Sequence, residues 1–357
     1  MNIIVQPKWI IFFAFFFWGG LAIIPTSLYY GVDKSYPLIL FLVLIFLMTL
    51  RLKNPTDYSF KISKIFIFFS LLYVFFQIFF NNAIPFLNTV GSVVSEFKTN
   101  EGDGRTATNL LDTIFSFAPI VILASDLNKK YRYFLYFLVI IPFIGISRGL
   151  LFFYLIVFFI TEVKFNFFKW FIIIISIYLI ISWVSVFRDG IDSGFNSNPF
   201  IDSFLAPVFN FTLLFQKDPT TFTSFEYFYQ IIQKPIPSFI FEKNILSTNL
   251  IYTRVLYEKV ETISVFTYLP EIYFFGKNSM IQTFLLSVYF FILVKIVNTI
   301  TRRSKYFYYA FAFLFVILLR SRFLDIISFS LAMIICFYFN KFLFSIERLF
   351  LSNFQKT

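Results

Sequence analysis

The sequence predicts an all-α fold: a polytopic bundle of about ten transmembrane helices that forms a single membrane domain over residues 1–357. Hydrophobic residues make up 59% of the chain and charged residues only 14%, whereas soluble domains carry roughly 25% charged residues. The apolar residues are gathered in long blocks, and basic residues fill the short connections between them. Together these observations indicate a membrane protein that crosses the bilayer many times.

The apolar blocks are the predicted helices. They cover residues 9–28, 36–50, 65–80, 108–125, 133–147, 149–161, 168–187, 276–297, 306–319 and 323–340. The first block follows Lys8 and ends without a small-residue cleavage site, so we expect a retained span rather than a signal peptide. Residues 188–275, between the seventh and eighth helices, are expected to form one large extracytoplasmic loop.

The basic connections predict the orientation of the bundle. With the N-terminus in the cytoplasm, every strongly basic short connection falls on the cytoplasmic side. These cations are Arg51, Lys53, Lys61, Lys64, Lys129, Lys130, Arg132, Lys164, Lys169, Arg302, Arg303 and Lys305, followed by Lys341 and Arg348 after the last predicted helix. Both termini are then cytoplasmic. The formal charge of +11 is thereby assigned to orientation in a lipid bilayer, and no nucleic-acid partner is expected.

Residues 133–147 and 149–161 are predicted to form a hairpin rather than one long helix. A single helix of about 28 residues measures roughly 42 Å, which exceeds the ~30 Å hydrocarbon core. It also places Arg148 near the middle of the bilayer, at a cost of about 3 kcal/mol. In the hairpin, Arg148 lies instead at a tip below the outer surface.

Arginines on the predicted outer face are the candidate binding residues, because orientation alone places cations inside. They are Arg148, Arg188, Arg254, Arg320 and Arg322. A guanidinium group presents a planar fork of donors that suits phosphate, and it stays charged when partly desolvated. A recessed cluster of this kind fits a membrane-anchored pyrophosphate. The alternative is that each arginine simply extends to the lipid headgroups.

Few other residues are candidates for catalysis or metal binding. Glu271 precedes the eighth helix and either accepts a proton from an attacking sugar hydroxyl or pairs with an arginine. The chain has no histidine, and Cys336 is its single cysteine, so histidine catalysis and an intramolecular disulfide are excluded. Glu101 and Asp103 alone are weak candidates for a metal site. We therefore predict no metal and no cofactor.

In this setting the chain resembles the bacterial O-antigen or oligosaccharide repeat-unit polymerases. Several short segments in the same order carry the resemblance, together with the large loop after the seventh helix. They are GISRG at 145–149, KPIP at 234–237, FEK at 241–243, PEIYFFG at 270–276, and Arg320 at the outer end of the penultimate helix. The layout covers nearly the whole chain, although each motif is short and degenerate.

The resemblance implies a metal-independent glycosyltransferase of the bacterial inner membrane. It implies transfer of a growing glycan from undecaprenyl pyrophosphate to a new lipid-linked repeat unit, with Arg148 and Arg320 holding the pyrophosphates and Glu271 activating the acceptor. We expect further substrate contacts from the outer arginines Arg188, Arg254 and Arg322, and the resemblance adds Lys243 and Tyr273. The implied partners are the undecaprenyl-pyrophosphate-linked oligosaccharide and a chain-length regulator.

Some features depart from the family, and two other functions stay open. Some members carry a glycine eleven residues after an outer arginine, but Phe159 and Pro199 occupy those positions here. One alternative is an O-antigen ligase, although related ligases use a histidine that this chain lacks. The other is a transporter or flippase of lipid-linked sugars, although paired broken helices in two halves are not evident.

Overall fold

The structure is a computed structural model, and it describes a little over half of the chain. The described residues are 6–56, 58–79, 114–143, 148–163, 171–172, 175–176, 179, 210–216, 272–273, 280–318 and 323–354. The predicted loop at 188–275 and the seventh predicted helix therefore lie largely outside the described residues. Within that loop, residues 210–216 are helical.

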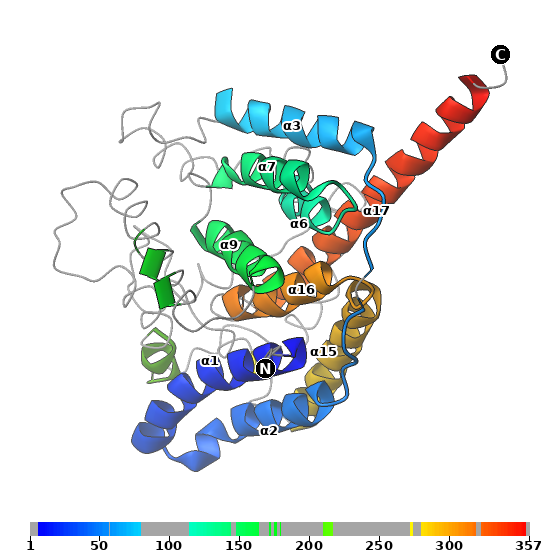
Figure 1. Cartoon of the computed structure of the whole chain (residues 1–357). Helices are drawn as coiled ribbons and strands as arrows, with labels where there is room; N and C mark the ends of the chain where they lie inside the picture. Colours follow the sequence, from blue (N-terminus) through cyan, green and yellow to red (C-terminus); the bar gives the residue numbers. More distant parts are fainter. Residues whose placement is uncertain are drawn as a thin grey trace, which may run out of the picture.

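The described residues fold mainly as helices, and the part of the chain that the structure describes contains no β-strand; its isolated bridge residues include Phe60, which pairs with Ser125. The named helices are α1 Pro7–Tyr30, α2 Val32–Thr49, α3 Lys64–Phe79, α6 Ala118–Leu123, α7 Lys129–Ile140, α9 Arg148–Glu162, α15 Met280–Thr301, α16 Lys305–Leu318 and α17 Phe323–Phe354 (Figure 1). Among the described residues, two segments form helices long and apolar enough to span a membrane, at Met280–Thr301 and Phe329–Phe350. Five shorter helical segments are also apolar.

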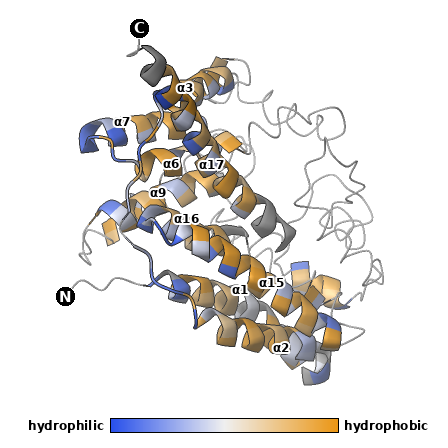
Figure 2. Cartoon of the chain, turned by 90° about the vertical axis from the view of Figure 1, so that its right-hand side faces the viewer, coloured by the Kyte–Doolittle hydropathy of each residue, from blue (hydrophilic) through white to orange (hydrophobic). Residues whose placement is uncertain are grey.

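The outer surface of the bundle is apolar. Large side chains such as Phe13, Phe68, Phe134 and Ile281 are more than 60% exposed. Figure 2 shows hydrophobic residues along most of each helix, with hydrophilic residues mainly at helix ends and in the connections. Small polar side chains lie inside instead: Thr26, Ser35, Ser70, Thr283, Ser287 and Ser330 are buried. Apolar surface facing outward and small polar groups between helices are typical of bundles packed in lipid.

Four phenylalanine rings join the first two helices to α15 and α16. Phe15 lies 5.3 Å from Phe290 and 6.0 Å from Phe315 between ring centroids, and Phe290 lies 5.6 Å from Phe315. Phe41 of α2 completes the group, 6.2 Å from Phe15. All four rings are nearly inaccessible. This aromatic cluster is the core that holds the N-terminal and C-terminal parts of the chain together.

Helices α1 and α2 form a hairpin around Gly31, whose φ of 87° is a backbone conformation that side chains with a Cβ rarely adopt. The hydroxyl groups of Ser27 and Ser35 lie 3.0 Å apart across the turn. The indole nitrogen of Trp18 donates to the carbonyl of Val316 over 3.0 Å, which fixes α1 against α16.

The hairpin of the fifth and sixth predicted helices is confirmed. Helix α7 ends at Ile140, just before Pro142, and α9 begins at Arg148. Their antiparallel pairing is secured by Tyr136, which donates to the carbonyl of Tyr154 over 2.7 Å, and by the rings of Phe137 and Phe158, 5.0 Å apart. The two helices are therefore separate arms, as the charge of Arg148 required.

Several predicted boundaries are wrong. Helix α7 covers Lys129–Ile140 rather than 133–147, and α15 continues to Thr301 rather than ending at 297. The helix expected at 108–125 is broken within its described part: a turn at Ser116 and Phe117 separates residues 114–115 from the short helix α6. Pro119 explains the break, because proline favours the first turn of a new helix. The last helix was expected to end at residue 340, yet α17 continues to Phe354 and includes Lys341 and Arg348.

The predicted cytoplasmic connections gather at one end of the bundle. We call residues 51–63, apart from residue 57, the strap; it runs from α2 to α3 past the turn between α15 and α16 (Figure 1). Thr56 donates its backbone N–H to the carbonyl of Arg302 over 2.7 Å, and Asp126 donates to the carbonyl of Phe60 over 3.0 Å. We call this end, which carries the strap and residues 124–128 and 302–304, the basic end.

The start of α3 is completed by the last helix of the chain. Ser63 precedes α3, and its hydroxyl oxygen accepts the N–H of Ile65 over 3.1 Å. Its hydroxyl donates to the Glu347 carboxylate of α17 over 2.9 Å, and the N–H of Lys64 donates to the same oxygen over 3.0 Å. A carboxylate beside a helix N-terminus satisfies free N–H groups and complements the helix dipole.

We expect Phe290→Ala to lower the free energy of unfolding by about 4 kcal/mol, because it removes a buried ring from the aromatic cluster. Thermal unfolding of the detergent-purified protein measures the loss. The matched control is Phe284→Ala on the same helix, where the ring is 49% exposed; its cost should stay within about 1 kcal/mol. Equal losses in the two variants would contradict the proposed core.

Candidate functional site

The sequence-predicted site is only partly within the described residues. Six of its members lie outside them: Arg320, Glu271, Arg188, Arg254, Arg322 and Lys243. Arg148 is the first residue of α9, and its backbone alone is described. Tyr273 is the one member whose side chain is described. The geometry of this site is therefore inferred from the positions of the helix ends.

Helices α9 and α16 pack side by side and run in opposite directions (Figure 1). The start of α16 lies at the end of α9, because Tyr306 donates its hydroxyl to the Glu162 carboxylate over 2.5 Å. The two helices have similar lengths, 15 and 14 residues. The end of α9 that bears Arg148 therefore lies at the same end of the bundle as Leu318 of α16, about 20 Å from the basic end. Arg320 follows Leu318 by two residues in the sequence.

Tyr273 is packed rather than open. Its side chain is 5% exposed, and its ring centroid lies 4.4 Å from that of Phe215. Phe211, Leu214 and Phe215 of the helical segment 210–216 are themselves buried. The predicted outer loop therefore contributes a helical segment that covers Tyr273, and the ring helps to hold this segment in place.

A second polar cluster lies at the basic end and was missed by the sequence reasoning. Arg132 of α7 pairs with Glu162 of α9, with 3.2 Å between a guanidinium nitrogen and Oε1, and the two side chains are only 14% and 8% exposed. The hydroxyl of Tyr133 donates to Oε2 of Glu162, and that of Tyr306 donates to Oε1. Three helices thus converge on one carboxylate.

The Glu162 cluster is positioned by local capping and by stacking. Asn128 accepts the N–H of Lys130 over 3.2 Å and so begins α7 one turn before Arg132. The Arg132 guanidinium also donates to the carbonyl of Ser125 over 3.3 Å. It lies 5.6 Å from the ring centroid of Tyr133 and 5.7 Å from that of Tyr306, so the cation is stacked as well as paired.

This arrangement joins helices and does not present a reactive group. Both carboxylate oxygens of Glu162 accept hydrogen bonds from neighbouring side chains, and such bonds offset the cost of partly burying a polar group. Within the described residues, no group of three or more acidic or cysteine side chains is placed to hold a metal ion.

The losses of stability caused by replacing Arg132 and by replacing Glu162 should not be additive. We expect Glu162→Leu to lower the free energy of unfolding by about 3 kcal/mol, because the buried guanidinium of Arg132 loses its counter-charge. The double variant Arg132→Leu/Glu162→Leu should be destabilised by less than the sum of the two single variants. Lys130→Leu, exposed on the same helix, is the control. Strict additivity in thermal unfolding would argue against a coupled pair.

Comparison with known proteins adds no relative. No protein-family model matches the chain, no curated protein matches it, and no solved structure matches it. The resemblance to the O-antigen polymerases thus continues to rest on the motifs in the sequence.

Proposed function

We propose that this protein is a polymerase of lipid-linked oligosaccharide repeat units, acting at the outer face of the bacterial inner membrane. One observation carries the proposal beyond the motifs. The packing of α9 against α16 in opposite directions puts the end of α9 at Arg148 and the end of α16 at Leu318, just before Arg320 in the sequence, at the same end of the bundle, opposite the basic end. Cations at this end do not serve orientation by the positive-inside rule, so they are available for an anionic substrate.

The proposed reaction moves a glycan between two lipid carriers. A hydroxyl of the incoming repeat unit attacks the anomeric carbon of the growing chain, and a carbon–oxygen bond forms. The bond from that carbon to undecaprenyl pyrophosphate breaks, and the pyrophosphate leaves with the electron pair. Arg148 and Arg320 bind the phosphates and stabilise the charge that develops on the leaving group. Glu271 accepts the proton of the attacking hydroxyl.

The other predicted residues, apart from Tyr273, bind the substrates. Arg188, Arg254 and Arg322 contact phosphates at the outer surface, and Lys243 contacts the sugars from the 188–275 loop. Tyr273 supports this loop through its contact with Phe215. A chain-length regulator is a further protein partner of the polymerase.

The proposed orientation places the basic end in the cytoplasm, together with both termini. The gathering of the strap, residues 124–128 and residues 302–304 at one end supports this orientation, because these connections hold Arg51, Lys53, Lys61, Arg302 and Arg303. The apolar outer surface of the bundle supports its place in the bilayer.

Cysteine labelling tests the orientation. In a Cys336→Ala background, we expect an impermeant maleimide to label Arg148→Cys and Arg320→Cys in intact spheroplasts. Lys53→Cys, on the exposed strap, should react only after the membrane is permeabilised. Labelling of positions 148 and 320 from opposite faces, or only from inside, would refute the proposed site.

Activity of the purified protein tests the function. We expect it to elongate lipid-linked repeat units in detergent without any ion gradient. Arg148→Ala and Arg320→Ala should each reduce the rate at least 100-fold, because each removes a charge that stabilises the leaving group. Arg51→Ala, exposed at the basic end, should retain the rate of the unmodified protein. Long-chain product from the Arg148→Ala/Arg320→Ala double variant would contradict the assignment.

A deletion strain separates the alternative functions. Loss of a polymerase leaves single repeat units attached to the lipid A core, whereas loss of a ligase leaves long polymer unattached. Loss of a flippase leaves lipid-linked repeats in the cytoplasmic leaflet. Only the first outcome agrees with the proposal.

A further inference from the structure

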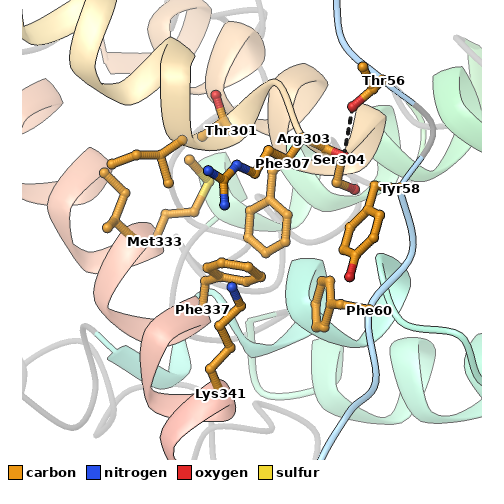
Figure 3. Close-up of a pocket in the computed structure, with 12 residues that line it drawn as sticks. Thr56, Tyr58, Phe60, Thr301, Arg303, Ser304, Phe307, Met333, Phe337 and Lys341 are labelled. Atoms are coloured by element: carbon orange, nitrogen blue, oxygen red, sulfur yellow. Dashed lines mark hydrogen bonds between the residues drawn. The ribbon is translucent and has the colours of Figure 1, made fainter.

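A pocket of about 270 Å³ lies at the basic end, between the strap, the turn joining α15 to α16, and α17 (Figure 3). Most of its wall is apolar, formed by Phe60, Ile300, Phe307, Met333, Ile334 and Phe337. The rings of Phe60, Phe307 and Phe337 contact one another with centroids 5.1 to 5.9 Å apart. The pocket is therefore a lined cavity held by packing between three segments of the chain.

Two positively charged side chains line this pocket. Arg303 comes from the α15–α16 turn and Lys341 from α17, and both are exposed. Figure 3 shows the guanidinium and the ammonium groups turned towards the rings of Phe307 and Phe337. The Lys341 nitrogen lies 4.7 Å from the ring centroid of Phe337. None of the described residues that line the pocket is acidic; Asp57 lies outside the described residues.

The wall also contains an unused hydrogen-bond donor. Ser304 lines the pocket beside Arg303, and its hydroxyl has no hydrogen-bond partner among the described residues. Thr56, by contrast, donates its hydroxyl to the carbonyls of Arg302 and Arg303. Two positive charges and a free hydroxyl favour an anion that accepts several hydrogen bonds, such as a phosphate.

Towards the middle of the bundle, a second and separate cavity lies next to the pocket. This smaller cavity of about 40 Å³ lies between α15, α16 and α17, and it shares Ile334 with the charged pocket. Its lining is apolar except for Ser330. From Lys341 to Ser330 the two cavities together border α17 over about 16 Å, at roughly 1.5 Å per residue. Charge at the mouth and apolar walls behind it define a site for an amphiphile.

We propose that this pocket binds an anionic glycerophospholipid of the surrounding bilayer, with its phosphate between Arg303 and Lys341 and one acyl chain along α17. The charge favours an anion over a zwitterion, and the apolar walls favour a lipid over a soluble phosphate. Basic pockets between helices on the cytoplasmic side of membrane proteins bind anionic headgroups by the same chemistry. The strap and α17 form part of the wall, so a bound lipid links them.

Lipid-dependent stability of the full chain tests this site. We expect phosphatidylglycerol added to the detergent-purified protein to raise the thermal midpoint by about 4 °C, the shift for a ligand near a hundred times its dissociation constant. Phosphatidylcholine and soluble glycerol phosphate should each give a much smaller shift. Native mass spectrometry should detect one retained phosphatidylglycerol.

The variant Arg303→Gln/Lys341→Gln should lose both the shift and the retained lipid. The control Arg51→Gln/Arg348→Gln removes the same charge from exposed residues that do not line the pocket, and it should keep both. An equal shift with phosphatidylcholine, or an unchanged response in Arg303→Gln/Lys341→Gln, would overturn the proposal. A larger shift with a polyprenyl phosphate would assign the pocket to a carrier lipid instead. Glycan elongation is measured in a separate assay. Loss of lipid binding at the basic end can then be distinguished from loss of the proposed reaction at the opposite end.

Discussion

An apolar environment around the bundle is the constraint on which the rest of the structure depends. Phe13, Phe68 and Phe134 point outward, so lipid rather than water surrounds the helices in the proposed setting. Such surroundings offer no hydrogen bonds to the backbone, and helices satisfy their own N–H and C=O groups. The described chain is accordingly helical wherever it is apolar, and its few irregular segments lie where polar partners are present.

Those polar partners are concentrated at the basic end. Hydrogen bonds from Thr56 to Arg302, from Asp126 to Phe60 and from Ser63 to Glu347 tie connections that are far apart in the sequence. The Glu162 cluster joins α7, α9 and α16 at the same level. This end is therefore cross-linked by polar contacts, whereas the middle of the bundle relies on packed rings such as Phe15 and Phe290. The proposed reaction is assigned to the opposite end.

The sequence was informative where a single rule decides the structure. Apolar length and flanking charge placed α1, α2, α3 and α16 close to their observed bounds, and the charge of Arg148 separated α7 from α9. The extension of α17 was missed because Lys341 marks the end of an apolar block without ending a helix. The Glu162 cluster depends on Tyr306, 144 residues away, and the pocket needs three separate segments. Such contacts follow from tertiary packing, which local patterns do not encode. For the predicted substrate site, the residue types could be read from the sequence. Only the packing of α9 against α16 shows that the relevant ends of these helices lie at the same end of the bundle.

The carboxylate of Glu347 at the start of α3 has a consequence for biogenesis. In the proposed membrane setting, α3 is synthesised long before residue 347 leaves the ribosome, so the N–H of Lys64 waits for its partner on α17, whereas the N–H of Ile65 already has the Ser63 hydroxyl. Early insertion intermediates thus carry an unfinished helix start that water at the membrane surface must satisfy. Completion of the start of α3 is tied in this way to the synthesis of α17.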